Sequence, residues 1–227
     1  MTDRALVFGA SGALGSAVCR RLEADEVEVV RVTRQAAQQP GWLSAGVPDW
    51  ANSLEARSVN RVVWAHGVNA EGSIKDSGVE QLQNLFEANV LFIAQTLRTL
   101  LDRDVLAPPA RLVIVSSVWQ NVARDRKLAY VTTKAALAGL VRSLVADLGE
   151  TGISVNAVLP GVVDTPMTRE FLSLEQIQGL QRDTPTGSLV TAEEVASTCA
   201  WLSSPQSSGI NGQFVSVDGG WSEVRHV

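Results

Sequence analysis

Short apolar runs rich in valine and isoleucine recur along the chain and alternate with segments of helical periodicity. Six of these runs are predicted to be strands: "ALVFGA", "VEVVRVT", "RVVWAHG", "RLVIVSS", "ISVNAVLPG" and "GQFVSVDGG". Because the runs are apolar almost throughout, both faces of each strand are expected to be buried. The pattern predicts an α/β fold, a single-domain Rossmann-type doubly wound parallel sheet with helices on both faces. We expect residues 1–227 to form this one domain.

Two long helices are predicted between the strands, each with a wide apolar stripe at helical spacing. The first covers 82–97, with Leu82, Leu85, Phe86, Asn89, Val90, Ile93 and Leu97 on one face. The second carries Leu137, Leu140, Val141, Leu144, Val145 and Leu148.

Two segments, 35–53 and 164–190, lack clear periodicity. The second has prolines on either side of a helical piece and lies between two predicted strands. Irregular segments of this length in a compact domain are usually functional. We therefore expect 164–190 to form a substrate lid.

Composition and charge narrow the class of partner. The chain has 45% hydrophobic residues and a net charge of -5, and its basic residues are scattered. This distribution offers no basic surface for nucleic acid or an anionic membrane, so a small-molecule ligand is expected. No uninterrupted apolar run reaches the roughly 18 residues of a membrane span, and the protein is expected to be cytoplasmic. Cys19 and Cys199 stand alone in helical patterns and are interpreted as buried thiols, with no metal site.

A glycine-rich stretch, "VFGASGALGSAV", follows the first predicted strand and opens the first helix. Gly9, Gly12 and Gly15 would let the backbone approach a pyrophosphate at the positive end of that helix. A turn with only a packing role is the alternative. The strand-to-helix context favours dinucleotide binding.

The second predicted strand ends at Thr33 and Arg34, where a dinucleotide's adenosine ribose would lie. An NAD site usually presents a carboxylate there, whereas a guanidinium suits the 2′-phosphate of NADP(H). A solvated arginine is the alternative. NADP(H) is therefore the expected cofactor, and NAD(H) remains open.

A hydroxyl, a phenol and an ammonium come together in the segment 116–134. Ser116 and Ser117 follow a predicted strand and should lie at the carboxyl edge of the sheet, where open parallel sheets bind ligands. Tyr130 and Lys134 are four residues apart and share a face if the segment is helical. A cation within about 4 Å could supply the roughly 4 kcal/mol needed to bring a tyrosine pKa from about 10 to about 7.

These residues resemble the short-chain dehydrogenase/reductase family over nearly the full chain. The family has a Tyr-x-x-x-Lys pair and a serine thirteen positions before the tyrosine, and Ser117 to Tyr130 is thirteen. "EANVLF" carries Asn89 where the family has a catalytic asparagine, and "NAVLPGVVDTPM" matches its segment around the nicotinamide. The tail "GINGQFVSVDGGW" is similar to the family's closing strand.

The resemblance implies an oxidoreductase site and a role for each residue. Tyr130 would be the general acid/base, Ser117 would bind the substrate oxygen, and Lys134 would bind the nicotinamide ribose and lower the pKa of Tyr130. Asn89 would hold a water in the proton relay. The implied cofactor-binding residues are Gly9, Ser11, Gly12, Leu14, Gly15, Arg34, Ala65, His66, Gly67, Tyr130, Lys134, Pro160, Gly161, Val163 and Thr165. Relatives pair their long helices between subunits, which implies a homodimer or homotetramer.

The sequence departs from the family pattern at three places. Most members of this length have G-x-x-x-G-x-G after a threonine, but here Phe8 precedes G-x-x-G-x-x-G. The family's Asn-Asn-Ala-Gly is "WAHG", which brings His66 near the cofactor as a packed, ribose-contacting or catalytic group. The short spacing from Arg34 to Trp64 predicts that the third helix is short or missing, and Asp49 is one candidate for the adenine contact.

The predicted function is hydride transfer between NADP(H) and the carbonyl or alcohol carbon of a small substrate, with reduction of a ketone as the favoured direction. One alternative is an NAD-dependent alcohol dehydrogenase of the same fold. The other is a non-catalytic nucleotide-sensing protein, since a fold alone does not fix activity. Trp119, Val122, Met167, Phe171 and Leu172 suggest a partly apolar substrate pocket.

Overall fold

A seven-stranded parallel sheet forms the centre of the molecule. The computed structural model describes residues 3–34, 39 and 41–224. The sheet consists of β1 (Arg4–Phe8), β2 (Glu28–Thr33), β3 (Leu43–Ser44), β4 (Val59–Trp64), β5 (Leu106–Val115), β6 (Ile153–Pro160) and β9 (Phe214–Val217). Its order is β3-β2-β1-β4-β5-β6-β9, and every neighbouring pair is parallel. All six predicted strands are present, and the predicted fold class is confirmed; the two-residue strand β3 was not predicted.

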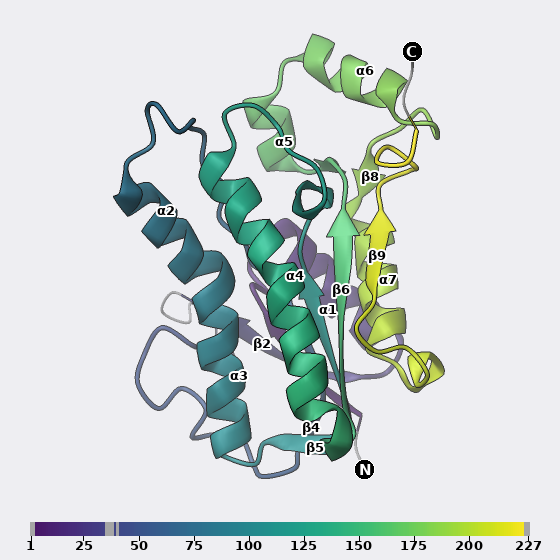
Figure 1. The fold of residues 1–227 in the computed structure, drawn as a ribbon. Coiled ribbons are helices and arrows are strands. Elements are labelled where there is room, and N and C mark those ends of the chain that lie inside the picture. Colours follow the sequence, from purple (N-terminus) through teal and green to yellow (C-terminus); the bar gives the residue numbers. More distant parts are fainter. Residues whose placement is uncertain (1–2, 35–38, 40, 225–227) are drawn as a thin grey trace.

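Helices cover both faces of the sheet (Figure 1). One face carries α2 (Val79–Phe86), α3 (Phe92–Asp102) and α4 (Leu128–Leu148), and the other carries α1 (Ala13–Ala24) and α7 (Ala192–Leu202). Short turns of helix complete this set: η1 (Glu87–Leu91), η2 (Val118–Gln120), η3 (Gly149–Thr151) and η4 (Pro205–Ser207).

Alternate side chains of each strand enter two separate cores, as both-face burial requires. On β1, Leu6 and Phe8 belong to the core under α3 and α4, whereas Ala5 and Val7 belong to the core under α1 and α7. All four are fully buried. The near-continuous apolar runs in the sequence therefore have a direct structural cause.

The strand order reverses between β1 and β4, which lie side by side in the middle of the sheet. At such a point the connections leave the sheet in opposite directions and open a crevice at the carboxyl ends of the strands. The glycine-rich stretch, the end of β4 and the segment after β5 all lie at this edge.

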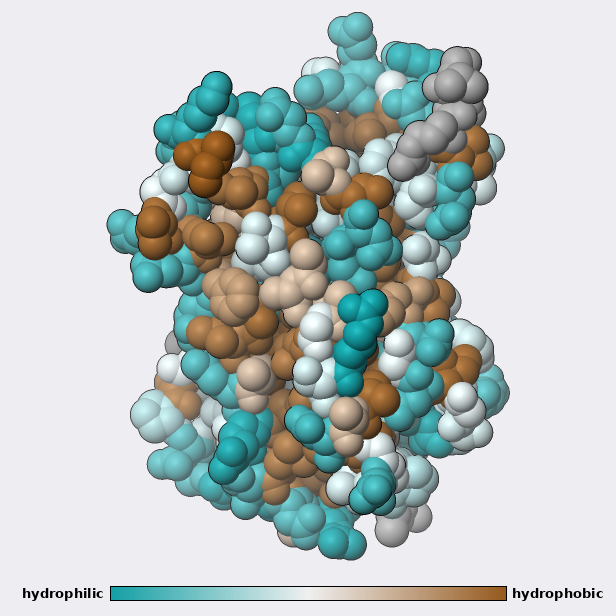
Figure 2. Space-filling view, in the orientation of Figure 1, coloured by the Kyte–Doolittle hydropathy of each residue, from teal (hydrophilic) through white to brown (hydrophobic). Residues whose placement is uncertain are grey.

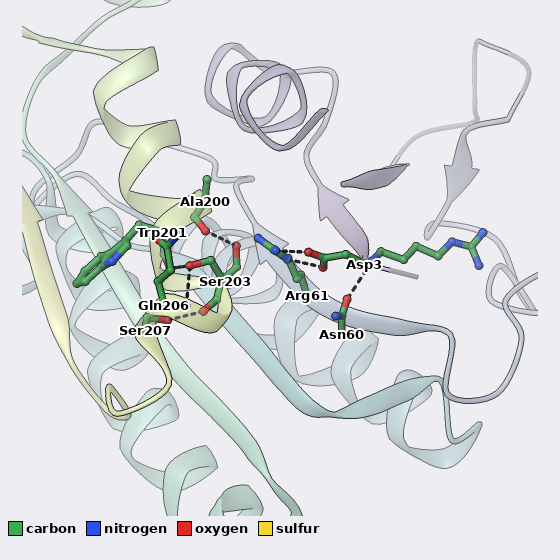
Figure 3. A network of polar contacts seen from close by, with 10 residues as sticks. Asp3, Asn60, Arg61, Ala200, Trp201, Ser203, Gln206 and Ser207 are labelled. Carbon is green, nitrogen blue, oxygen red and sulfur yellow. Dashed lines mark hydrogen bonds and ion pairs between the residues drawn. The ribbon is translucent and has the colours of Figure 1, made fainter. Parts of the chain in front are cut away.

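The opposite, amino-terminal edge of the sheet is closed by polar contacts (Figure 3). The Arg61 guanidinium donates to both carboxylate oxygens of Asp3, and the backbone N–H of Arg4 donates to Asn60 Oδ1 at 2.9 Å. The end of α7 lies in the same region, where Ser203 Oγ donates to the carbonyl of Ala200 at 3.1 Å. No predicted site residue lies in this network.

The first predicted helix is continuous from α2 through η1 to α3, but its middle turn is a π-helix over Glu87–Leu91. The predicted stripe is correct, because Leu85, Val90 and Leu97 are buried. The π turn was not predicted. Such turns are rare and often occur at functional sites.

The segment after β2 has no helix among its described residues 39 and 41–58, as predicted from its length. It forms β3 and a series of turns. Asp49 is exposed within these turns and has a φ of 57°. Nothing in the described part of the chain connects its carboxylate with the glycine-rich stretch, so its proposed adenine contact gains no support.

The segment 164–190 contains two helices, α5 (Pro166–Phe171) and α6 (Leu174–Asp183), where one helical piece was predicted. A two-stranded parallel ladder of β7 (Val163–Asp164) and β8 (Val190–Thr191) holds its two ends together. The α6 helix has no buried residue. Both helices lie beyond the carboxyl ends of the strands in Figure 1.

Two further predictions from composition can be compared with the structure. Cys19 and Cys199 are both free and buried, as expected. One helical stretch, Leu128–Thr151, is long and apolar enough to cross a membrane by length and composition alone, although polar residues interrupt its apolar sequence. In the fold it packs on the sheet, and Leu137 and Val141 are fully buried there.

Candidate active site

Ser117 and Tyr130 form the centre of the candidate site. Ser117 follows β5 directly and is the N-cap of η2, where its Oγ accepts the backbone N–H of Trp119 at 3.3 Å. Tyr130 lies in the first turn of α4, and the Ser117 side chain interacts with its phenol in a way that lowers the phenol pKa. Ser116 is separate from this pair, because its hydroxyl donates to Gln120 Oε1 at 3.0 Å.

Lys134 lies one helical turn after Tyr130, as the spacing predicted. Its Nζ is 5.6 Å from the centroid of the Tyr130 ring and donates to the carbonyl of Val115 at 3.2 Å. The side chain is buried without a carboxylate partner among the described residues. Burial lowers the pKa of Lys134 to about 8.

The Tyr130 pKa is raised in this structure, whereas the sequence predicted that it would be lowered. Burial raises the pKa of Tyr130 above its ordinary value, and the interaction with Ser117 only partly opposes this. Desolvation is the larger effect and decides the direction. At neutral pH Tyr130 therefore carries its proton.

Asn89 is buried in the π turn and is fully engaged with protein atoms. Its Oδ1 accepts the N–H of Val68 at 2.8 Å, and its Nδ2 donates to the Val68 carbonyl at 2.9 Å and to Thr133 Oγ1 at 3.0 Å. Because both amide hydrogens are used, the side chain cannot donate one to a water. Asn89 instead ties the segment after β4 to α4, one residue before Lys134.

Close packing explains two of the three glycines in the glycine-rich stretch, but it does not explain Gly12. A Cβ on Gly15 would lie 2.1 Å from the Gly9 carbonyl oxygen, and one on Gly9 would lie 2.8 Å from the backbone nitrogen of His66. Close packing therefore requires these two glycines. A Cβ on Gly12 would meet only Gly9 O, at 3.4 Å. The open side of Gly12, at the N-cap of α1, fits a phosphate group approaching the helix end.

Ser11 and Leu14 belong to the same turn, with Ser11 exposed and Leu14 half-buried. Across the crevice, Ala65, His66 and Gly67 follow β4, and the Ala65 N–H donates to the Phe8 carbonyl at 3.0 Å. A Cβ on Gly67 would point toward Lys134 Nζ at 3.5 Å. The structure thus brings the glycine turn, the end of β4 and Lys134 along one crevice.

His66 is half-buried as a residue, but both nitrogens of its neutral imidazole are buried. Its ring packs edge-to-face on Phe92 with centroids 4.7 Å apart, and neither ring nitrogen makes a hydrogen bond of normal geometry in the described structure. Burial, followed by the positive charges of Lys134 and Arg34, lowers the pKa of His66 to about 3, although the Ala88 carbonyl favours protonation slightly. Because the imidazole is neutral and neither ring nitrogen has a hydrogen-bond partner in the described structure, we interpret His66 as a packing residue rather than an acid/base catalyst.

This burial predicts a pH-dependent stability. The His66 pKa is about 3 in the folded protein and 6.5 ordinarily, so below pH 6.5 the unfolded chain binds the extra proton and the folded state loses stability. The loss should be about 2 kcal/mol between about pH 7.5 and about pH 5, measured by urea unfolding. The His66→Asn variant should lose much less over the same interval. Equal losses in the two proteins would show that His66 does not titrate as described.

At the end of β2, Thr33 is buried against β3 whereas Arg34 is exposed to solvent. Thr33 is buried and its hydroxyl donates to the Leu43 carbonyl at 3.5 Å, toward β3. Arg34 is exposed, and no ion pair involves it in the described part of the chain. Its positive charge contributes to the lowered pKa of His66.

The remaining predicted cofactor residues follow β6. Pro160 ends the strand, and the Gly161 N–H donates to the Val217 carbonyl at 2.9 Å. Val163 belongs to the ladder at the base of the 164–190 segment. Thr165 is the N-cap of α5, where its hydroxyl accepts the N–H of Thr168 at 3.2 Å. This capping contact gives Thr165 a structural role, while its contact with a nicotinamide stays a prediction.

Sequence reasoning missed three residues at the site. Thr133 fixes Asn89, and Trp221 packs its ring on Trp119 with centroids 5.2 Å apart. Asp218 accepts hydrogen bonds from Gly220 and Ser222 and so shapes the turn that carries Trp221. The "DGG" sequence was a possible turn signal, but nothing indicated its partner. Of the predicted pocket residues, Trp119 and Val122 are half-buried near the site, and the side chains of Met167 and Phe171 lie outside the described part.

A family model described as enoyl-(acyl carrier protein) reductase matches residues 47–222. An uncharacterized oxidoreductase of Bacillus subtilis is 28% identical over 241 residues, which cover 97% of this chain and 99% of the relative.

Solved structures share the whole fold. A short chain dehydrogenase family protein of Francisella tularensis superimposes with a TM-score of 0.87 at 23% identity, covering 99% of this chain and 100% of the other. A candidate 2-deoxy-D-gluconate 3-dehydrogenase of Agrobacterium tumefaciens with bound NADP has a TM-score of 0.84 at 24% identity, covering 96% and 95%.

Proposed function

Since the chain belongs to the short-chain dehydrogenase/reductase family and is an oxidoreductase acting between CH–OH and C=O groups, we propose that it is an NADP(H)-dependent ketone reductase. The observation that carries this proposal is the placement of Tyr130 next to the Ser117 side chain and one helical turn before Lys134, at the carboxyl edge of the sheet. The substrate would be a small molecule with a carbonyl or alcohol group.

The residues along the carboxyl edge of the sheet suit the successive parts of a dinucleotide. The glycine turn at the start of α1 would hold the pyrophosphate, and Arg34 would hold the 2′-phosphate of the adenosine ribose. His66 and Gly67 would face the middle of the cofactor, and Lys134 would hydrogen-bond the nicotinamide ribose. Pro160, Gly161, Val163 and Thr165 would border the nicotinamide. When bound, the nicotinamide supplies the hydride.

Arg34 favours NADP(H) over NAD(H), because it offers a charged donor where an NAD site would present a carboxylate. The NADP-bound structure of the Agrobacterium protein is consistent with that choice for this fold. NAD(H) is the alternative cofactor, and the binding experiment on Arg34 discriminates between the two.

Tyr130 donates the proton in this proposal. Its raised pKa keeps the phenol protonated at neutral pH, which is the form required to protonate the oxygen of a carbonyl during reduction. The Ser117 hydroxyl would hydrogen-bond that oxygen from the other side and hold it within reach of Tyr130. Reduction is the proposed direction, and in that direction Tyr130 begins in the protonated form.

Asn89 acts as a positioning residue for Lys134 rather than as a side-chain donor to water. Its hydrogen bonds with Val68 and Thr133 fix the segment after β4 against α4, so Gly67 and Lys134 stay close. A relay water could be held only by groups other than the Asn89 amide hydrogens.

The proposed function is tested by following NADPH consumption with a panel of neutral ketones, with NADH measured in parallel. Consumption that depends on both enzyme and ketone supports the proposal. Tight NADPH binding with no turnover of any ketone or alcohol would favour a nucleotide-sensing protein instead. No described residue of the site specifically supports that alternative.

We also propose that a second copy of the chain covers α4, giving a homodimer or homotetramer in the cytoplasm. The stretch Leu128–Thr151 has a mean hydropathy of 1.3, yet only 28% of its most apolar window is buried. Figure 2 shows brown, tan and white groups over the middle of this face with few teal ones. An apolar helix whose leucines and valines are in part only half-buried suits an interface between subunits.

This assembly predicts the effect of a charge at Gly139 on α4. A Cβ there meets nothing within 4 Å, so Gly139→Glu should not disturb the single chain but should bury a carboxylate in the interface. Light scattering should give a multiple of the 24.2 kDa chain mass for the native protein and a lower mass for the variant. Gly209→Glu, at an equally open position in the loop after η4, should leave the mass unchanged. A native protein of 24.2 kDa at micromolar concentration would contradict the proposal.

A further inference from the structure

Two tryptophans from distant parts of the chain meet beside the candidate proton donor. Trp119 is the second residue after Ser117, and its backbone N–H is hydrogen-bonded to the Ser117 hydroxyl at 3.3 Å. Its ring packs on that of Trp221 with centroids 5.2 Å apart and planes at 67°. Both side chains are half-buried, so part of each indole remains accessible.

The C-terminal turn holds Trp221 rigidly in this position. Asp218 accepts the backbone N–H groups of Gly220 and Ser222, both at 2.9 Å, and the Trp221 N–H donates to the Asp218 carbonyl at 3.2 Å. Gly219 has a φ of 63°, and a Cβ there would lie 2.4 Å from Thr186 Oγ1. The turn is therefore packed against residues 184–186, where the 164–190 segment returns to the body of the protein.

Trp221 also borders the underside of that segment. A small cavity is lined by Trp221, Leu180 of α6, Val162, Leu189 and Asp218. Leu180 is half-buried on a helix that has no buried residue of its own. A substrate that reaches Ser117 and Tyr130 from this side would meet Trp119 and Trp221 on one side and α6 on the other.

Charges around the tryptophan pair disfavour an anionic substrate. The Asp218 carboxylate is buried and accepts hydrogen bonds only from N–H and O–H groups, without a cation partner in the described structure. Arg169, the cation on α5, is already paired with both oxygens of Asp164 at 2.6 and 2.7 Å. An added carboxylate or phosphate beside Trp221 would meet the negative charge of Asp218 at low dielectric.

We propose that Trp119 and Trp221 form an aromatic wall that selects uncharged ketones carrying a flat or alicyclic apolar ring next to the carbonyl group. The inference rests on the proposed ketone reductase function and names the substrate class of that same site. Indole faces give ring-shaped groups a large contact area, and aromatic pairs contribute about 0.5 to 1.5 kcal/mol beyond the area they bury. Acyclic ketones too small to touch the wall do not gain this contribution.

The test compares three ketones: an aryl methyl ketone, a small acyclic ketone, and an α-keto carboxylate with the same aryl ring. In the native protein kcat/KM should be highest for the aryl ketone and lowest for the keto acid. Trp119→Leu and Trp221→Leu should each lower kcat/KM for the aryl ketone about tenfold, mainly through KM, and leave the acyclic ketone within a few-fold. Trp221→Phe should restore most of the loss. Trp201→Leu, at the end of α7 near the opposite edge of the sheet (Figure 3), should change neither value.

A second readout separates this inference from the proposed function. Binding of the aryl ketone should quench tryptophan fluorescence in the native protein, and Trp119→Leu should remove much of that quenching whether or not turnover occurs. If no ketone is reduced, the proposed ketone reductase function is wrong. The quenching still tests whether Trp119 and Trp221 bind the aryl ketone. An unchanged ratio of aryl to acyclic kcat/KM in both Leu variants, or a preference for the keto acid, would overturn the inference.

Discussion

Replacing Tyr130 with Phe is expected to lower ketone reduction by about 10² to 10⁴-fold, the usual contribution of a positioned general acid. The variant keeps the aromatic ring and loses only the hydroxyl that interacts with Ser117. The fall should appear in kcat and in kcat/KM alike, because the lost interaction acts on the reacting oxygen. Binding of NADPH, followed by its fluorescence, should change little.

The protonation state of Tyr130 can be measured separately, because it is the only tyrosine in the chain. The near-ultraviolet signal of tyrosinate should appear only above the ordinary tyrosine pKa of about 10 in the protein without cofactor. Reduction should accordingly not require a deprotonated tyrosine at neutral pH. Turnover of Tyr130→Phe within a few-fold of the native rate would remove Tyr130 from the mechanism.

Replacing Arg34 with Ala is expected to remove most of the preference for NADPH over NADH. A charged hydrogen bond contributes about 1.5 to 3 kcal/mol, which corresponds to roughly ten- to a hundredfold in affinity. The loss should be confined to NADPH, since NADH has no 2′-phosphate on the adenosine ribose for Arg34 to bind. Calorimetric titration of both cofactors against both proteins measures it.

Arg103→Ala is the matched control for net charge, because Arg103 is exposed at the end of α3. It should leave the ratio of the two affinities unchanged. Equal or tighter binding of NADH by the native protein would replace the NADP(H) assignment with the NAD(H) alternative.

The sheet and its two helical layers could be predicted from the sequence because burial leaves a local pattern. Strands such as β4 and β5 are buried on both faces, which gives continuous apolar runs, and the stripe at Leu137 and Val141 marks a helix that packs on them. The spacing of Tyr130 and Lys134 likewise fixes their relation within one helix.

Features that depend on distant contacts could not be predicted in this way. The π turn at Asn89 accompanies hydrogen bonds to Val68 and Thr133, which are remote in the sequence. The pairing of Trp119 with Trp221 depends on how the last strand and its turn pack. The pKa of Tyr130 was predicted in the wrong direction for the protein alone because spacing shows which charge is near but not what burial costs.

The central claim is that this chain transfers a hydride to a ketone carbon while Tyr130 protonates the oxygen. The most direct measurement uses NADPH deuterated at the transferring position of the nicotinamide, an aryl methyl ketone, and mass spectrometry of the product. The native protein should give the alcohol with one deuterium on the former carbonyl carbon, and Tyr130→Phe should give about 1% of that amount or less in the same time. Failure of the folded native protein to move deuterium from either NADPH or NADH to any neutral ketone would contradict the claim.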